Sequence, residues 1–155
     1  TPRSEMASRL SCEAHGRRRT LVTVIAEVGA LSRRIDPGIK LIGRVKTSAS
    51  IAHKMATQGL HQDQVLDIIG IRAITRTEAD CYRLADRIGD AFVTLNSEFD
   101  DYIDQPKANG YRSIHTTLAH PSGLLVEVQI RTRWMDELCS HGAAAHARYK
   151  EASLG

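Results

Sequence analysis

Residues 107–131 read K-A-N-G-Y-R-S-I-H-T-T-L-A-H-P-S-G-L-L-V-E-V-Q-I-R, and this stretch decides the predicted fold. Polar and apolar residues alternate on both sides of the Pro-Ser-Gly at 121–123, which is typical of two half-buried strands joined by a tight turn. Folding the hairpin about Ser122 makes one face apolar and the other polar, since side chains two residues apart share a face. A sheet needs an apolar face for its core but no ordered polar row, so we interpret the row as a candidate site. Its facing pairs are Thr117 and Glu127, His115 and Gln129, and Ser113 and Arg131.

The composition indicates one domain with a substantial core. The chain has 155 residues, 42% of them hydrophobic, and a net charge of +3. No apolar run approaches the roughly 18–20 residues that a membrane span requires, and no signal-peptide pattern opens the chain. The three cysteines lack C-x-x-C spacing, so we expect reduced thiols and no zinc site. We therefore expect action in the cytoplasm, without a membrane or DNA partner, and, from the start at Thr1, a piece of a longer protein.

The order of predicted elements indicates an α/β (α+β) domain. Residues 1–17 show no period and are expected to be a tail or linker before a domain spanning 18–155. The order predicts a mixed sheet of four or five strands with helices packed on it. The expected helices cover residues 18–34, 50–58, 78–92 and 133–150, and the expected strands cover 39–45, 67–75 and the two arms of the hairpin.

Two packing details follow from the same patterns. The Ile-rich run at 67–75 is expected to be a strand buried on both faces. Arg72 within it is then an anomaly, because a buried Arg needs a partner or a pocket. In the last helix we expect Trp134, Leu138 and the alanine run at 143–145 to form the packing surface.

Asp67 and Glu127 stand at strand positions among apolar neighbours. Two carboxylates on adjacent strands, without His or Cys, suit Mg²⁺, which takes oxygen ligands and often substrate phosphates. The alternative is that both are exposed acids at strand ends. Carboxylates surrounded by cations describe a polyphosphate site, and the absence of G-x-x-x-x-G-K-[ST] excludes a P-loop. The cations are Arg44, Lys46, Lys54, Arg72, Lys107 and Arg131.

Tyr111 and His115 lie at the entrance to the hairpin and have two interpretations each. Tyr111 would either stack on a nucleobase or fill the base of the hairpin with apolar surface. His115 would either bind phosphate or ribose or serve as a structural hydrogen-bonding group. The residues alone leave both questions open.

Seven short motifs together resemble the synthetase domain of the RelA/SpoT family, the stringent-response enzymes that make (p)ppGpp. They occur in the family's order over about residues 18–150. The motifs are G-R-V-K at 43–46, S-I-A-H-K-M at 50–55, D-I-I-G-I-R at 67–72, E-F-D-D-Y-I at 98–103, P-K-A-N-G-Y-R-S-I-H-T-T at 106–117, E-V-Q-I-R-T at 127–132 and G-A-A-A-H-A-R-Y-K at 142–150. The E-F-D-D run resembles the acidic version of this loop in synthesis-only relatives.

The resemblance implies a nucleotidyltransferase-like fold and a pyrophosphokinase. Such an enzyme transfers the β,γ-pyrophosphate of ATP to the ribose 3′-hydroxyl of GTP or GDP and releases AMP. The resemblance also implies Mg²⁺ held by Asp67 and Glu127, with Glu127 helping to deprotonate the hydroxyl. The implied ATP contacts are Arg44 and Arg72 on adenine and Lys46, Ser50 and Lys54 on the phosphates. The implied acceptor contacts are Tyr111 stacked on the base, with Lys107, Asn109, His115 and Gln129 around it.

Two alternatives stand beside this interpretation. A short synthetase core also resembles the toxin branch of the superfamily, which uses ADP or ATP as acceptor to make (p)ppApp, and stacking on Tyr111 does not distinguish guanine from adenine. That branch implies delivery from another cell and an immunity partner, whereas the main branch implies a parent protein that regulates the domain. The second alternative is a nucleotide- or RNA-binding module without catalysis, which the presence of Asp67 and Glu127 disfavours.

Overall fold

The computed structural model describes residues 2–45 and 69–140, with side chains from residue 16 onward in the first range. Residues 133–140 are helical and follow the last strand directly. No helix of these ranges is long and apolar enough to cross a membrane. The elements, in order, are α1 (Pro2–Ile35), β1 (Lys40–Val45), β2 (Ile69–Thr75), α3 (Glu78–Ala91), β3 (Val93–Thr94), η2 (Asn96–Glu98), β4 (Asp100–Asp101), β5 (Ile114–Ala119) and β6 (Leu125–Thr132).

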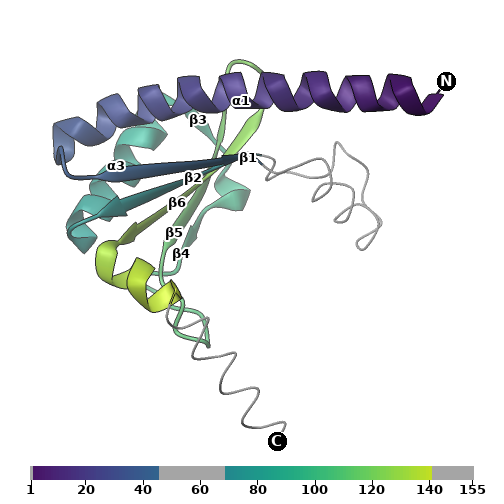
Figure 1. The fold of residues 1–155 in the computed structure, drawn as a ribbon. Helices are drawn as coiled ribbons and strands as arrows, with labels where there is room; N and C mark the ends of the chain where they lie inside the picture. The colour runs from purple at the N-terminus through teal and green to yellow at the C-terminus, as the bar shows by residue number, and fades with distance from the viewer. Residues whose placement is uncertain (1, 46–68, 141–155) are drawn as a thin grey trace, which may run out of the picture.

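The strands of the described ranges form one mixed sheet in the order β1-β2-β6-β5-β3, with β4 paired to β5 (Figure 1). The pair β2–β6 is parallel, and all other pairs are antiparallel. A mixed sheet packed by helices confirms the predicted α/β (α+β) class. The sheet has six strands instead of four or five because β3 and β4, of two residues each, are too short to show a period.

The β5–β6 hairpin has the predicted register. Its turn closes with a hydrogen bond of 2.9 Å from His120 N to Leu124 O. Gly123 in this turn has φ of 91°, a conformation that glycine adopts without steric cost. The confirmed pairs are Thr117 with Glu127 and His115 with Gln129.

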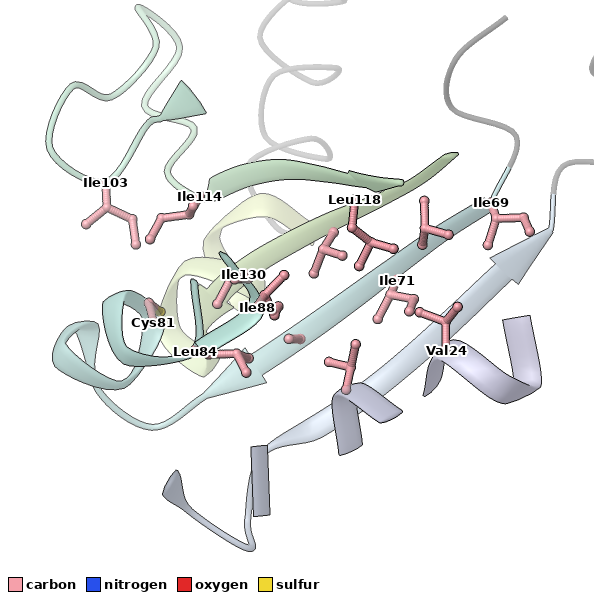
Figure 2. Close-up of a cluster of buried hydrophobic side chains, with 14 of the residues drawn as sticks. Val24, Ile69, Ile71, Cys81, Leu84, Ile88, Ile103, Ile114, Leu118 and Ile130 are labelled. Carbon is pink, nitrogen blue, oxygen red and sulfur yellow. The ribbon is translucent and has the colours of Figure 1, made fainter. Parts of the chain in front are cut away.

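Helices α1 and α3 cover one face of the sheet and also pack against each other. Figure 2 shows the aliphatic side chains that fill the space between the helices and the strands. Gly43 lets α1 approach β1 closely, because a Cβ at this position would lie 2.5 Å from Ile25 Cδ1. The side chains at most 2% exposed in this core are Val24, Val28, Ile69, Ile71, Ala73, Cys81, Leu84, Ile88, Ile114, Leu118, Val126, Val128 and Ile130.

Helix α1 begins at Pro2, well before residue 18, where the apolar stripe begins. Proline is favoured in the first turn of a helix, and many of the residues after it, such as Ala, Glu, Met, Leu and Arg, are good helix formers. Periodicity therefore located only the part of α1 that packs on the sheet, and the N-terminal part extends beyond the sheet (Figure 1). A boundary between a linker at 1–17 and a domain at 18–155 stays a prediction.

Strand β2 is buried on both faces only near its end, where Ile74 is 7% exposed, so the expectation of burial on both faces is wrong at Gly70 and Arg72. Ile69, Ile71 and Ala73 point into the core, but the side chain of Arg72 is 43% exposed on the opposite face. This placement removes the anomaly, because the guanidinium meets open space and not an apolar interior.

The described part of the last helix packs through a residue that was not predicted. Met135 is 3% exposed and joins the core, whereas Trp134 and Leu138 are 61% and 44% exposed. The cause is local: the Thr132 hydroxyl accepts a hydrogen bond from Met135 N at 3.2 Å, and this cap turns Met135 inward. The helix expected at 50–58 and the alanine run expected to pack at 143–145 lie outside the described residues.

Candidate active site

The face of the sheet opposite α1 and α3 carries a groove of about 330 Å³, within the range of small-molecule sites. Its walls come from the neighbouring strands β1, β2 and β6, and the lining residues are Ile42, Arg44, Gly70, Ile71, Arg72, Glu127 and Gln129. The strand register gathers them in two rows that cross the sheet. One row is Arg44, Gly70, Glu127 and Thr117, and the other is Ile42, Arg72, Gln129 and His115.

Arg44 and Arg72 form the β1–β2 side of the groove. They are diagonal neighbours on this antiparallel pair, since Arg44 is directly opposite Gly70, two residues before Arg72. Diagonal positions lie about 7–8 Å apart, roughly twice a van der Waals contact, so two parallel side chains at these positions would leave room for a flat ring between them. Gly70 leaves the space beside them open, because a Cβ there would meet nothing closer than Glu127 O at 3.9 Å.

Glu127 on β6 stands at the centre of the site. Its Oε1 accepts a hydrogen bond from Gln129 Nε2 at 3.4 Å and lies 3.7 Å from His115 Nδ1. The Gln129 amide is held in turn, because its Oε1 accepts from Arg131 Nη2 at 3.2 Å. With its side chain 25% exposed, the Glu127 carboxylate is supported by its neighbours and still open to the groove.

Tyr102, Tyr111 and His115 form an aromatic cluster on the β5 side of the site. The Tyr111 hydroxyl lies 2.7 Å from His115 Nε2. The Tyr102 ring packs edge-on, with centroid distances of 5.2 Å to His115 and 6.2 Å to Tyr111. Lys107 Nζ lies 4.7 Å from the Tyr102 centroid and 5.5 Å from that of Tyr111. An aromatic platform beside a cation suits a nucleobase and its phosphates.

Burial sets the protonation of this cluster. It raises the pKa of Tyr111, so the hydroxyl keeps its proton at a distance of 2.7 Å from His115 Nε2. Burial also lowers the pKa of His115, and the nearby Glu127 carboxylate opposes this shift less strongly. In the tautomer with the proton at Nδ1, a neutral imidazole would point that N–H toward Glu127 and would accept from the Tyr111 hydroxyl at Nε2.

Asn109 shapes the loop that presents Tyr111. Its Oδ1 accepts a hydrogen bond from Tyr111 N at 3.0 Å. A backbone hydrogen bond of 3.1 Å from Lys107 N to Tyr111 O closes the same loop. The Asn109 oxygen is thus used to hold Tyr111, which leaves the exposed amide nitrogen for a ligand.

The two aspartates of the acidic stretch at 98–101 make different contacts. Asp100 is paired with His115 across β4 and β5 and borders the aromatic cluster. Asp101 instead accepts hydrogen bonds from the protein and fixes the loop. The donors to Asp101 Oδ1 are Ile103 N at 3.0 Å, Asp104 N at 3.1 Å and the Tyr82 hydroxyl at 3.2 Å.

Eight of the predicted site residues therefore lie around one face of the sheet, while Lys46, Ser50, Lys54 and Asp67 fall outside the described residues. Within the described ranges, no three His, Cys, Asp or Glu side chains form a cluster that could hold a metal ion. The prediction did not name Tyr102, which packs in the aromatic cluster, or Asp136, whose carboxylate lies 3.6 Å from Arg72 Nη1, and it gave Arg131 no role beyond its charge. Tyr102 lies in an irregular loop and Asp136 on a helix, so strand alternation gave no signal for either. The eight are Arg44, Arg72, Lys107, Asn109, Tyr111, His115, Glu127 and Gln129.

The family described as "Region found in RelA / SpoT proteins" matches residues 43–153 of this sequence. The chain belongs to the RelA/SpoT family. It is 46% identical over 113 residues to the guanosine-3′,5′-bis(diphosphate) 3′-pyrophosphohydrolase of Spiroplasma citri, covering 73% of this chain and 15% of that protein. It is 46% identical over 108 residues to the GTP pyrophosphokinase rsh of Brucella ovis, covering 70% and 14%. The chain thus spans less than a fifth of the length of these RelA/SpoT relatives.

Solved structures show the same fold. The small alarmone synthetase 2 of Bacillus subtilis is 25% identical, with a TM-score of 0.72 over 94% of this chain and 82% of that one. The small alarmone synthetase 1 of the same organism, bound to its product pppGpp, is 24% identical with a TM-score of 0.71 over 92% and 83%. The type VI effector Tas1, in complex with its immunity protein, is 12% identical with a TM-score of 0.63 over 77% and 60%. The last two likenesses concern the fold alone, and this RelA/SpoT chain shares it.

Proposed function

We propose that this chain is a pyrophosphokinase domain that transfers the β,γ-pyrophosphate of ATP to the ribose 3′-hydroxyl of GTP or GDP. The observation that carries the proposal is the strand order. Two arginines spaced for a flat ring lie on the β1–β2 side of Glu127, and an aromatic cluster with a cation lies on its β5 side. Two nucleotides bound on these sides would meet at the carboxylate. The name GTP pyrophosphokinase of the Brucella relative agrees with this assignment.

ATP would bind on the β1–β2 side. Arg44 and Arg72 hold the adenine between their guanidinium planes, a use for which Arg is better suited than Lys. The open space at Gly70 lets the nucleotide pass toward Glu127. By the family motif, Lys46, Ser50 and Lys54 hold the phosphates.

The acceptor nucleotide would bind on the β5 side. Tyr111 stacks on its base, and Lys107 neutralises its phosphates. His115 and Gln129, from adjacent strands, lie between Tyr111 and Glu127, where the ribose of the acceptor would sit. The Asn109 amide borders the same ligand.

The reaction needs the 3′-oxygen of the acceptor to attack the β-phosphorus of ATP. The bond between that phosphorus and the α,β-bridging oxygen breaks, and AMP leaves with the oxygen. Glu127 takes the proton of the hydroxyl, and the arginine and lysine side chains hold both nucleotides in line. Charge developing on the phosphates is offset by these fixed cations.

A divalent cation fits the residues at the centre. Glu127 offers carboxylate oxygens at the groove, and Mg²⁺ is commonly bound by one or two carboxylates together with substrate phosphates. Asp67 would be the second carboxylate. When bound, the ion would neutralise charge on the transferred phosphates.

An acceptor panel tests the proposal. The domain is incubated with Mg-ATP and each of GTP, GDP, ATP and ADP, and the nucleotides are resolved by anion-exchange chromatography. We expect AMP and a 3′-pyrophosphorylated product with GTP or GDP. Product from adenosine acceptors alone would assign the chain to (p)ppApp synthesis, and no AMP with any acceptor would refute the enzymatic function.

A further inference from the structure

One carboxylate oxygen of Asp136 lies between two arginines from neighbouring strands. Asp136 Oδ1 is 3.6 Å from Arg72 Nη1 on β2 and 3.2 Å from Arg131 Nε on β6. Asp136 lies on the helix that follows β6, one residue after the buried Met135. The cap at Thr132 and the anchor at Met135 therefore fix where this carboxylate stands.

The two arginines that contact Asp136 differ in burial, so the ion pair has a different effect on each. The Arg72 side chain is 43% exposed, so the ion pair contributes little stability and acts mainly by restricting where the guanidinium points. Arg131 is 1% exposed, so its charge is buried and requires a counter-charge. Asp136 is the acid within ion-pair distance of Arg131 among the described residues.

Arg131 extends this arrangement to the β5 side. Its Cζ lies 5.7 Å from the centroid of the Tyr111 ring, and its Nη2 donates to Gln129 Oε1 at 3.2 Å. Gln129 in turn donates to Glu127. A shift of the Arg131 guanidinium would therefore move both the stacking ring and the amide that supports the central carboxylate.

We propose that Asp136 is a positioning residue that sets Arg72 for the nucleotide donor and Arg131 for the acceptor. This inference rests on the proposed function, because it takes Arg72 as a contact of ATP and Tyr111 as a contact of the acceptor. Asp136 touches neither nucleotide itself. A single carboxylate thus makes the geometry of the two half-sites depend on the docking of one helix.

A purely structural role predicts a different result. An acid in the first turn of a helix stabilises it through the helix dipole, and that effect alone would lower the melting temperature without changing substrate affinity. Glu137 lies in the same helix and is exposed, and the ion pairs of Arg72 and Arg131 in the described residues go to Asp136 and not to Glu137. The Glu137→Gln variant therefore removes an equal charge from the same turn and serves as the matched control.

The experiment measures the Kd of a non-hydrolysable ATP analogue and the Kd of GDP by calorimetry, with KM and kcat from AMP release. We expect Asp136→Asn to weaken both nucleotides about tenfold, and Glu137→Gln to stay within about twofold of wild type. In an Arg72→Ala background, Asp136→Asn should leave the Kd of the ATP analogue unchanged and still weaken GDP. If Asp136→Asn does not fold, Asp136→Glu keeps the charge and displaces it by one methylene, and weaker binding of both nucleotides is again expected.

The outcomes separate this inference from the proposed function. In one outcome the wild type releases AMP, and Asp136→Asn or Asp136→Glu binds both nucleotides as tightly as Glu137→Gln does. That result would overturn the role of Asp136 alone. Wild type that binds neither nucleotide and releases no AMP would overturn the proposed function and this inference with it. Wild type that binds both nucleotides without AMP release would end the enzymatic proposal, and the calorimetry would still decide the role of Asp136.

Discussion

The two faces of the sheet are made from alternate residues of the same strands, yet they do different work. On the face toward α1 and α3, Val126, Val128 and Ile130 of β6 are fully buried. On the opposite face, Glu127 and Gln129 of the same strand stay partly exposed and line the groove. This difference indicates that substitutions at neighbouring residues of one strand can change stability and activity separately.

Glu127→Gln is expected to have the largest effect on the groove face. The amide keeps the shape of the side chain but neither takes a proton nor offers a carboxylate to a cation, so AMP release should fall by about a thousandfold or more. The melting temperature should stay near that of wild type, because Glu127 is not part of the apolar core. Near-normal AMP release from a folded Glu127→Gln protein would remove Glu127 from the central role.

Ile130→Ala is the matching change on the core face. The side chain is 0% exposed, and truncation of a buried Ile costs about 2–5 kcal/mol of unfolding free energy. Urea unfolding measures this loss, with Ile130→Val as the milder control at about 0.5–1.5 kcal/mol. The folded fraction of Ile130→Ala should keep wild-type KM values. Normal stability together with weak nucleotide binding would contradict the division of stability and activity between the two faces.

Tyr111 sharpens the comparison within the groove face. Stacking of a base on an aromatic ring is worth about 1–3 kcal/mol, so Tyr111→Ala should raise the acceptor KM about 5- to 100-fold. Tyr111→Phe keeps the ring and loses only the hydrogen bond to His115, a loss of about 1 kcal/mol. The KM for ATP should not change in either variant, and equal losses for donor and acceptor would argue against separate sides.

Gly70→Ala tests the open space on the β1–β2 side. The added methyl group would meet only Glu127 O at 3.9 Å, so the strand accepts it. The methyl group would however enter the groove, and we expect ATP affinity to fall about fivefold, equivalent to about 1 kcal/mol of crowding. Calorimetry with the ATP analogue gives the answer, and unchanged affinity would show that the nucleotide does not pass Gly70.

Cys81 on the core face carries the smallest prediction, a pH effect. Burial raises the pKa of the Cys81 thiol from 9.0 to about 11. The thiol therefore loses its proton more readily in the unfolded chain, so its contribution to stability is complete below pH 9.0 and is lost as the pH rises through 11. Relative to Cys81→Ala, wild type should lose roughly 1 kcal/mol of unfolding free energy between pH 8 and pH 10. Urea unfolding at both pH values measures this loss. If the unfolding free energy changes by the same amount in wild type and Cys81→Ala, Cys81 is not desolvated.

The sequence predicted those parts of the site that depend on local alternation. The pairing of His115 with Gln129 and Thr117 with Glu127 followed from the period of the strands and the position of the turn. The exposed side of β2 did not follow, because a dense run of Ile looks the same whether one face or both are covered. Only the tertiary structure shows that Arg72 lines a groove.

Contacts between distant segments could be predicted only in part. The metal-site hypothesis already put the strands of Asp67 and Glu127 next to each other, but no local pattern encodes the parallel register that puts Arg72 beside Gln129. The role proposed for Asp136 depends on how one helix docks after β6, which its sequence does not reveal. The early start of α1 was missed for another reason, since periodicity detects only a helix that packs.

The alternation along β6 also limits how this chain can change in length. Inserting one residue after Val126 would turn Glu127 and Gln129 toward the helices and turn Val128 and Ile130 into the groove. Core and site would then be lost together in one event, however mild the inserted residue. Insertions and deletions should therefore accumulate in the connections, such as the exposed turn at 121–123, while β6 keeps its length.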